Sequence, residues 1–294
     1  MSTNSLGKEI VALRTSNNMT QKQLSDGICT QPTIRMIERG DITPALDTIY
    51  FISLKLKKPL RYFINILFSD SFSRIDKLVV YIEELTTQQK YEVVNEIVVK
   101  ELYENIENEW YQHFLKWQYY LSAYEIKKID FNEAIKSLKE LIQKKYDLII
   151  MRDFLKERIY NTIAFLYAKN QEIDLALFYY NKINFDEEII ISPRHNINIY
   201  YLRVMFNKSK TLFDSGNYTD AIALIKEGID KSIKAENMSF IGNFYYYLGM
   251  SYEVNNNSYQ DIRSCYKNAE YFFDLLGREL HLNILHSKKS EYIN

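Results

Sequence analysis

The stretch TQKQLSDGICTQPTIRMIERG, residues 20–40, decides the fold of the N-terminal part of the chain. Thr20 can cap a helix, and Gln23, three residues later, fits the reciprocal position of a capping box. Pro32 suits the first turn of a second helix, where no N–H donor is needed. Gly40 is typical of the position just past a helix end. The stretch therefore predicts two short helices joined by a tight turn, which is a helix-turn-helix.

The sequence on both sides of this pair predicts a small helical bundle. We expect the two helices to span residues 20–28 and 31–39. Apolar residues recur at helical spacing before and after them and predict two further helices, the later one opened by Pro44. A fifth helix is expected to start near Pro59. We therefore assign residues 1–68 to an N-terminal helix-turn-helix domain, here called the head.

The composition of the whole chain favours helices throughout. Its 294 residues are enough for about two domains, yet they include only 8 Gly and 4 Pro. Strand-rich folds need many tight turns, and doubly wound sheets need glycine-rich phosphate loops, so neither class fits this composition. The predicted fold class is all-α.

The net charge of −1 is distributed unevenly along the chain. The head holds nine Lys and Arg residues against five Asp and Glu, a net charge of +4, whereas residues 69–294 carry −5. This asymmetry is typical of a protein in which only the small domain meets nucleic acid.

The residue types along the head occur in an order that is specific to one kind of helix-turn-helix. The positions that carry this signal are Leu13, Arg14, Met19, Thr20, Gln21, Leu24, Ile28, Ile34, Ile37, Glu38, Arg39, Gly40 and Pro44. Together they resemble the lambda-repressor-like, or Xre/Cro-type, helix-turn-helix family. The resemblance implies that the second helix of the motif lies in the major groove of DNA.

The resemblance also implies roles for single side chains. The residues expected at the base edges are Gln31, Thr33 and Arg35. Gln can pair bidentately with adenine and Arg with guanine, so such residues read sequence directly. The residues expected at the DNA backbone are Gln21, Lys22 and Arg39.

Two features of the head are interpreted as structural. In the family, residues at the positions of Arg14 and Glu38 form an ion pair that holds the first helix to the third. Cys29 lies in the turn, and we interpret it as a small core residue rather than a redox sensor, since its spacing fits no metal site.

Residues 69–294, which follow the head, show a repeat with a period of about 40 residues. Small residues at helix crossings alternate with aromatic residues, which is the pattern of tetratricopeptide repeats. The clearest copies include Ser122 with Ala134, Ala164 with Ala176, Gly216 with Ala221, and Gly249 with Ala269; a weaker copy runs from Tyr81 to Glu101. After a linker at 69–75, residues 76–294 are predicted to form a superhelix of about five degenerate repeats, closed by a capping helix over 277–294. An irregular helical bundle is the alternative.

Three asparagines fall near corresponding places in the first helices of successive repeats: Asn161, Asn207 and Asn243. An Asn amide can donate to and accept from a peptide backbone at once. Spaced along a groove, such amides would hold an extended peptide irrespective of its side chains. The alternative is that they are merely exposed, in a chain that is rich in Asn.

The head and the repeats together carry a second resemblance. The matching stretches are residues 20–25, 28–29, 114–120, 123–124, 127–131, 241–242, 245–246 and 272–274. Along nearly the whole chain they resemble the PlcR-like branch of the RNPP family of regulators from Gram-positive bacteria.

This second resemblance implies a cytoplasmic quorum-sensing transcription regulator. Members bind a short signalling peptide that has been re-imported into the cell, and they act as homodimers on palindromic double-stranded DNA. In this branch the peptide-loaded form activates transcription. The family's peptide-clamping asparagines match Asn161 and Asn207, whereas Asn243 stands where a glutamine is usual.

Four positions bear on which peptide this chain would bind. Ile64 stands where the family presents a tyrosine to the peptide. Thr87 and Gln89 stand where the family has paired lysines that serve an acidic group, which leaves only Lys90 nearby. These departures indicate a different peptide.

No catalytic motif is found in the sequence. The four histidines have no metal-ligand spacing, and P-loop, GxSxG and CxxC motifs are absent. Cys29 and Cys265 lie far apart, which fits a reducing compartment. The N-terminus lacks the apolar core of a signal peptide, and no run approaches the roughly 18 apolar residues of a membrane helix. We therefore expect a cytoplasmic protein with no membrane partner, no enzymatic activity, no metal and no cofactor.

Two alternatives keep parts of this interpretation. In the first, a DNA-binding regulator uses its repeats to bind a partner protein or only to dimerise, without a peptide. In the second, the chain is an interaction scaffold whose head no longer binds DNA. A short reading frame beside the gene that encodes a signal peptide would favour the peptide sensor, and salt-dependent DNA affinity would exclude the scaffold.

Overall fold

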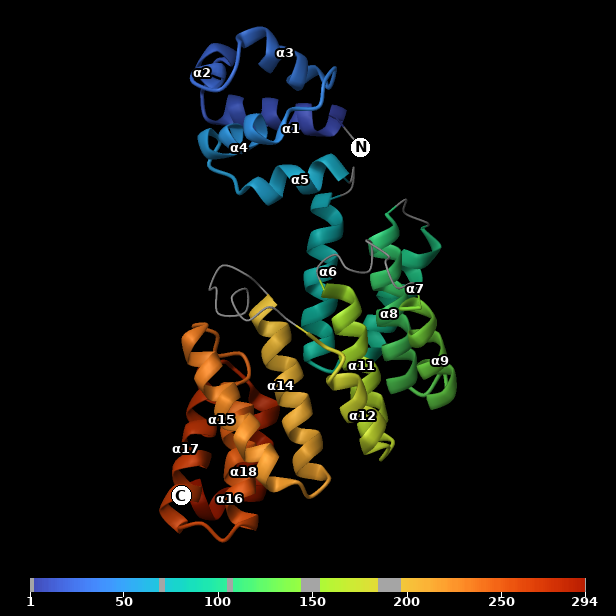
Figure 1. Ribbon diagram of the computed structural model, residues 1–294, viewed down its shortest axis with the longest axis vertical. Helices are drawn as coiled ribbons and strands as arrows, with labels where there is room; N and C mark the ends of the chain where they lie inside the picture. Colours follow the sequence, from blue (N-terminus) through green and yellow to red (C-terminus); the bar gives the residue numbers. More distant parts are fainter. Residues whose placement is uncertain (1–2, 69–71, 105–107, 144–153, 185–196, 294) are drawn as a thin grey trace. The chain divides into compact units, whose positions relative to one another are not determined.

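The computed structural model describes residues 3–68, 72–104, 108–143, 154–184 and 197–293 (Figure 1). All regular structure in these ranges is helical, which confirms the predicted all-α class. The chain divides into two compact units. The first unit comprises Met1–Ile97 with Ile106–Tyr111, and the second comprises Val98–Asn105 with Gln112–Asn294.

The head is a bundle of five short helices at the start of the first unit. They are α1 (Thr3–Ser16), α2 (Gln21–Ser25), α3 (Gln31–Arg39), α4 (Leu46–Lys55) and α5 (Leu60–Phe68). α1 packs against α3 and α5, α2 against α3, and α4 against α5. The buried core residues are Leu6, Ile10, Leu24, Ile34, Ile37, Ile49, Ile52, Leu56 and Phe63. The predicted helical spacing of apolar residues therefore does place one continuous core inside the bundle.

The helix ends in the head follow the predicted signals. Thr20 caps α2 and forms the full capping box with Gln23. Pro32 lies in the first turn of α3, and Gly40 ends that helix in the left-handed conformation with a φ of 78°. Gly40 is required there because few other residues adopt a positive φ without strain.

Two predicted boundaries in the head are wrong. α2 ends at Ser25 and not at residue 28, because Asp26 leaves helical geometry directly after it. α4 begins at Leu46, with Ala45 at its N-cap, so Pro44 precedes the helix instead of opening it. A capping residue is visible in a sequence, whereas the last turn of a short helix depends on its packing.

α1 and α3 approach each other closely at Gly7. A Cβ atom on this residue would lie 2.5 Å from the carbonyl oxygen of Glu38 and 2.6 Å from that of Ile37. The neighbouring atoms are backbone and cannot turn away. Gly7 is therefore needed for the contact between these helices, and no local sequence signal indicates it.

The first unit continues with α6 (Phe72–Thr87) and with α7 (Tyr91–Tyr103) as far as Ile97; the rest of α7 is assigned to the second unit. α6 and α7 are two consecutive helices at the place of the weak repeat copy at 81–101. α6 starts inside the stretch 69–75 that is expected to be a linker, and residues 69–71 lie outside the described residues.

The second unit is a series of helix pairs followed by one last helix (Figure 1). The helices are α8 (Glu109–Glu125, assigned to this unit from Gln112 on), α9 (Phe131–Leu141), α11 (Leu155–Lys169), α12 (Ile173–Tyr180), α14 (Ile197–Asp214), α15 (Tyr218–Lys234), α16 (Ile241–Val254), α17 (Tyr259–Leu275) and α18 (Glu279–Ile293). α11 packs on α12, α14 on α15, α16 on α17, and α18 closes the series on α17. This order confirms the predicted helical repeat and excludes an irregular bundle.

Glycines allow aromatic rings to pack between neighbouring helices, both within one pair and between successive pairs. A Cβ atom on Gly228 of α15 would lie 2.4 Å from the ring of Phe244 on α16. On α16 itself, a Cβ atom on Gly249 would lie 2.9 Å from the ring of Tyr266 on α17. The small-and-aromatic alternation of the sequence is thus a packing pattern between helices.

Candidate functional site

The exposed face of α3 carries the residues expected to contact DNA. Gln31, Arg35 and Arg39 are all exposed and follow one another at intervals of four residues, so they share one face of the helix. Lys22 is exposed on α2. Thr33 is half-buried, and its hydroxyl lies 2.8 Å from that of Thr30, the N-cap residue. Its side chain is therefore engaged with the start of the helix.

Arg14 and Glu38 form the ion pair expected between the first and third helices. The Arg14 Nε donates to Glu38 Oε1 at 2.5 Å, and its Nη2 donates to Glu38 Oε2 at 3.2 Å. The Arg14 Nη1 also donates to the carbonyl oxygen of Met19, at 2.7 Å. Glu38 is buried, so this carboxylate has exchanged water for charged and polar partners inside the head.

Gln21 belongs to the same cluster, which the sequence does not indicate. Its Nε2 donates to Glu38 Oε2 at 2.7 Å. The residue is half-buried at the start of α2, so its side chain is oriented by Glu38 within the head. The expected phosphate contact of Gln21 would use an amide that this hydrogen bond already holds in place.

Asn161 and Asn207 meet in the second unit. Asn161 lies on α11 and Asn207 on α14, and the Asn207 Nδ2 donates to the Asn161 Oδ1 at 3.1 Å. Asn161 is buried, with 9% of its surface exposed, and Asn207 is half-buried. Two side chains separated by a whole repeat in sequence are therefore in direct contact.

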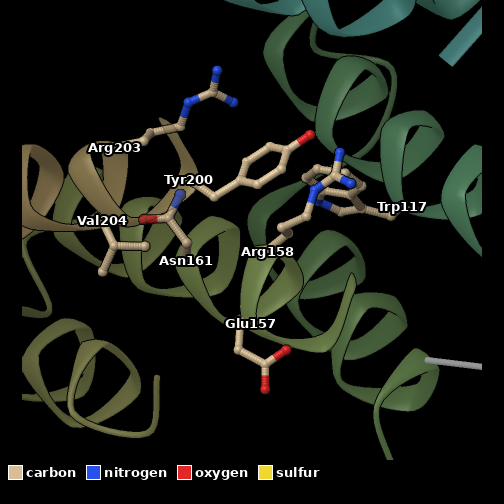
Figure 2. Close-up of a pocket in the computed structure, with 7 residues that line it drawn as sticks. All are labelled: Trp117, Glu157, Arg158, Asn161, Tyr200, Arg203 and Val204. Atoms are coloured by element: carbon tan, nitrogen blue, oxygen red, sulfur yellow. The ribbon is translucent and has the colours of Figure 1, made fainter. Parts of the chain in front are cut away.

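The pair lies beside a small recess, defined by the residues that line it: Trp117, Glu157, Arg158, Asn161, Tyr200, Arg203 and Val204 (Figure 2). These side chains come from α8, α11 and α14, which are the first helices of three successive pairs. The Asn161 oxygen accepts from Asn207, and the Asn161 amide nitrogen can donate to a ligand.

Aromatic rings fix Arg158 inside the recess. Its guanidinium lies 4.3 Å from the ring centroid of Tyr200, 4.8 Å from that of Trp117 and 5.6 Å from that of Phe114. Trp117 is itself held by a 2.9 Å hydrogen bond from its Nε1 to the hydroxyl of Thr162. Arg158 is only 5% exposed, so its charge is stabilised by cation–π contacts where water is scarce.

The remaining predicted peptide contacts are Asn243 and Lys90, and neither lines the recess. Asn243 is half-buried on α16, and no hydrogen bond joins it to Asn161 or Asn207 among the described residues. Lys90 is exposed in the turn between α6 and α7, and it does not line the recess. The structure therefore brings together two of the three predicted asparagines. Sequence reasoning missed Trp117 and Arg158, because their placement depends on three separate helices.

The positions that depart from the family pattern lie in the first unit. Ile64 is half-buried on α5, Thr87 ends α6, and Gln89 occupies the following turn with a φ of 58°. The Thr87 hydroxyl donates to the carbonyl oxygen of Glu83 at 2.9 Å.

Both cysteines pack as apolar side chains. Cys29 packs against the head core, and burial raises the pKa of its thiol. Cys265 is buried in the second unit, where burial raises its pKa to about 11, with a smaller contribution from Asp261. In the described ranges, no group of three His, Cys, Asp or Glu side chains gathers as metal ligands would. No helix of those ranges has the length and apolar composition needed to cross a membrane.

Family models match both parts of the chain. The model of the RNPP family C-terminal domain matches residues 79–294, and a helix-turn-helix model matches residues 10–63. The chain belongs to the RNPP family. A comparison with curated proteins finds no match.

Solved structures of RNPP regulators resemble the whole chain. PlcR from Bacillus thuringiensis in complex with the peptide PapR7 and DNA is 28% identical, with a TM-score of 0.84 over 99% of each chain. The apo form of the same protein is 26% identical, with a TM-score of 0.67 over 97% of this chain and 99% of that one. ComR from S. thermophilus, in complex with DNA and its signalling peptide ComS, is 14% identical, with a TM-score of 0.61 over 98% of this chain and 99% of that one, and shows the fold alone. The resemblance to the PlcR-like branch is thereby confirmed.

Proposed function

We propose that this RNPP protein is a peptide-responsive transcription regulator. Its head binds double-stranded DNA, and the recess of its second unit holds part of a short signalling peptide. The observation that carries the proposal is the hydrogen bond between Asn161 and Asn207 at the wall of the recess. It supports a peptide site because two amides that could each hold a peptide backbone are already aligned next to a cavity.

In the head, we assign each side chain a role in DNA binding according to how exposed it is. Gln31 and Arg35 project from α3 and would read base edges, while Lys22 and Arg39 would hold the DNA backbone. Gln21, held by Glu38, would meet a phosphate at the start of α2. The Thr33 hydroxyl would contact DNA while it keeps its hydrogen bond with Thr30, the N-cap residue of α3.

In the second unit, the amide nitrogen of Asn161 and the side-chain oxygen of Asn207 would hold the main chain of the peptide. Asn243 and Lys90 would contact the peptide outside the recess. Because backbone contacts ignore side-chain identity, specificity for one peptide would come from the residues around these amides.

We assign one role to each predicted domain. Residues 1–68 would bind DNA, and residues 76–294 would bind the peptide and form a homodimer. Residues 69–75 would join these two domains. A two-fold dimer suits a palindromic site, since the two heads then meet equivalent half-sites. Such a regulator would act in the cytoplasm, as an activator when peptide is bound. The peptide can shift the protein between two states only by binding them with different affinities.

The coupling between peptide and DNA gives the test. Random DNA duplexes are selected with the full-length protein, with and without synthetic peptides that match the C-terminal ends of short reading frames beside its gene. We expect palindromic DNA whose affinity changes with peptide and falls with salt. Specific DNA binding that no peptide alters would favour the peptide-independent regulator, and the absence of any specific DNA binding would favour the scaffold.

A further inference from the structure

The outer side of α4 in the head is apolar. Four large side chains of this helix are between 46% and 68% exposed: Leu46, Tyr50, Phe51 and Leu54. Leu46, Tyr50 and Leu54 follow one another at intervals of four residues and form one stripe, and the Phe51 ring lies 5.4 Å from that of Tyr50. These four residues are here called the α4 face. Contiguous exposed apolar groups of this kind mark a surface that another molecule covers.

Neither the core of the head nor DNA accounts for the α4 face. The side of α4 that packs inside the head is formed by Ile49 and Ile52, which are buried in its core. The side chains proposed to contact DNA lie on α2 and α3. Leucine and phenylalanine have no donor for a phosphate oxygen, so the α4 face suits an apolar surface of a protein.

The two ends of α4 carry opposite charges. Asp47 lies in the first turn, and Lys57 and Lys58 are exposed directly after the last turn. If two copies of α4 pair in antiparallel orientation, the acidic start of each helix lies beside the basic end of the other, and the helix dipoles also attract. Tyr50, the middle residue of the stripe, then lies at the two-fold axis. The α4 face is therefore complementary to itself, as a two-fold interface requires.

The size and charge of this surface indicate when it would pair. The exposed parts of its four side chains equal about two fully exposed ones, or about 400 Å² at roughly 200 Å² each. Two copies would then bury about 800 Å², which is less than the roughly 1,200–2,000 Å² of stable interfaces. Each head also carries a net charge of +4, so two free heads repel each other. DNA offsets this charge and holds the heads close together.

We infer that the α4 face binds the α4 face of a second copy of this chain when two heads occupy the half-sites of one palindrome. The inference rests on the proposed function, because it requires a homodimer on DNA. The contact makes binding of the two heads cooperative. It also fixes the distance between them, so the protein selects palindromes of one half-site spacing.

The first test is a disulfide across the two-fold axis. Tyr50→Cys is introduced into the full-length protein, which is bound to a selected palindromic duplex and oxidised with copper–phenanthroline. We expect a disulfide-linked dimer, because the two new thiols face each other at the axis. The wild-type protein is one control, since Cys29 packs against the head core and Cys265 is buried. Leu175→Cys, at an exposed leucine of α12, is the other.

The second test measures cooperativity with Leu54→Ser. Fluorescence anisotropy gives the affinity of the full-length protein for the palindromic duplex and for a duplex with one half-site. We expect Leu54→Ser to weaken binding to the palindrome about tenfold, because each copy loses an apolar contact. Its affinity for the single half-site should stay unchanged, which also shows that the head is folded. Leu175→Ser is the matched control and should leave both affinities as they are.

The outcomes separate this inference from the proposed function. A disulfide yield of Tyr50→Cys no higher than that of Leu175→Cys, on palindromic DNA that the protein still binds, would overturn the inference and leave the DNA-binding regulator intact. An undiminished affinity of Leu54→Ser for the palindrome would do the same. Absence of specific DNA binding by the wild-type protein would overturn both.

Discussion

The head and the second unit use buried polar side chains in opposite ways. In the head, Glu38 is buried and bound by Arg14 and Gln21, while Arg35, on the face proposed to bind DNA, is exposed to solvent. In the second unit, Arg158 and Asn161 line the proposed site and are themselves buried. Folding and ligand contact are thus separate in the head and combined in the recess. In the head, a substitution should therefore change either stability or DNA binding. In the recess, a substitution should change stability and peptide binding together.

The largest effect is expected where a buried charge loses its partner. Glu38→Ala leaves the Arg14 guanidinium without its carboxylate and should lower the free energy of unfolding of the head by about 3 kcal/mol. Hydrogen exchange of the α1 and α3 amides measures this loss. Asp41→Ala removes an exposed carboxylate from the same region and should change little. Equal effects of the two substitutions would show that the Glu38 cluster does not stabilise the head.

A slightly smaller effect is expected at the crossing of α1 and α3. Gly7→Ala places a methyl group against two backbone carbonyl oxygens and should cost about 1–3 kcal/mol of stability. Lys8→Ala, at the exposed neighbouring position, is the control. Thermal unfolding followed by circular dichroism compares them. An unchanged midpoint in Gly7→Ala would mean that the two helices are not as close as described.

The DNA face should respond without any loss of stability. Arg35→Ala should weaken specific binding by about 1–3 kcal/mol and reduce the preference at one base pair. Lys22→Ala should weaken binding to all DNA sequences alike. It should also reduce the slope of log affinity against log salt concentration by about one. Fluorescence anisotropy with selected and scrambled duplexes measures both. Uniform weakening by Arg35→Ala would reassign Arg35 to the DNA backbone.

The recess should show both effects at once. Asn207→Ala removes the donor to Asn161, so we expect stability to fall by about 0.5–1.5 kcal/mol together with peptide affinity. Asn257→Ala changes an exposed asparagine of the same unit and should alter neither. Urea unfolding and calorimetry give the two quantities. A loss of stability with unchanged peptide affinity would make Asn207 purely structural.

The smallest effect concerns Cys265. Its pKa of about 11 keeps the thiolate scarce near neutral pH, so alkylation of the folded protein should be slow and should accelerate as pH rises toward that value. Unfolding in urea should restore the rate of an ordinary cysteine. Mass spectrometry after a pulse of iodoacetamide measures the difference. Fast alkylation of Cys265 in the folded protein at neutral pH would contradict its burial.

The two regions also differ in how far the sequence predicts them. The capping box at Thr20 and the stop at Gly40 are local signals, so the helix-turn-helix could be predicted together with its exposed residues. The repeat placed Asn161 and Asn207 on corresponding helices, but their hydrogen bond depends on how two repeats stack. Arg158 could not be found in this way, because a basic residue on one helix gives no sign of the aromatic rings that enclose it.

The most direct test of the account is a calorimetric titration of the purified protein with peptides that match the C-terminal ends of short reading frames beside its gene. The Asn161→Ala/Asn207→Ala double variant is measured alongside, with its fold checked by circular dichroism. The account predicts micromolar or tighter binding to the protein and loss of that binding in the folded double variant. Equal binding by both proteins would contradict the assigned site. Failure of every peptide to bind a protein that still binds DNA would contradict the role as a peptide sensor.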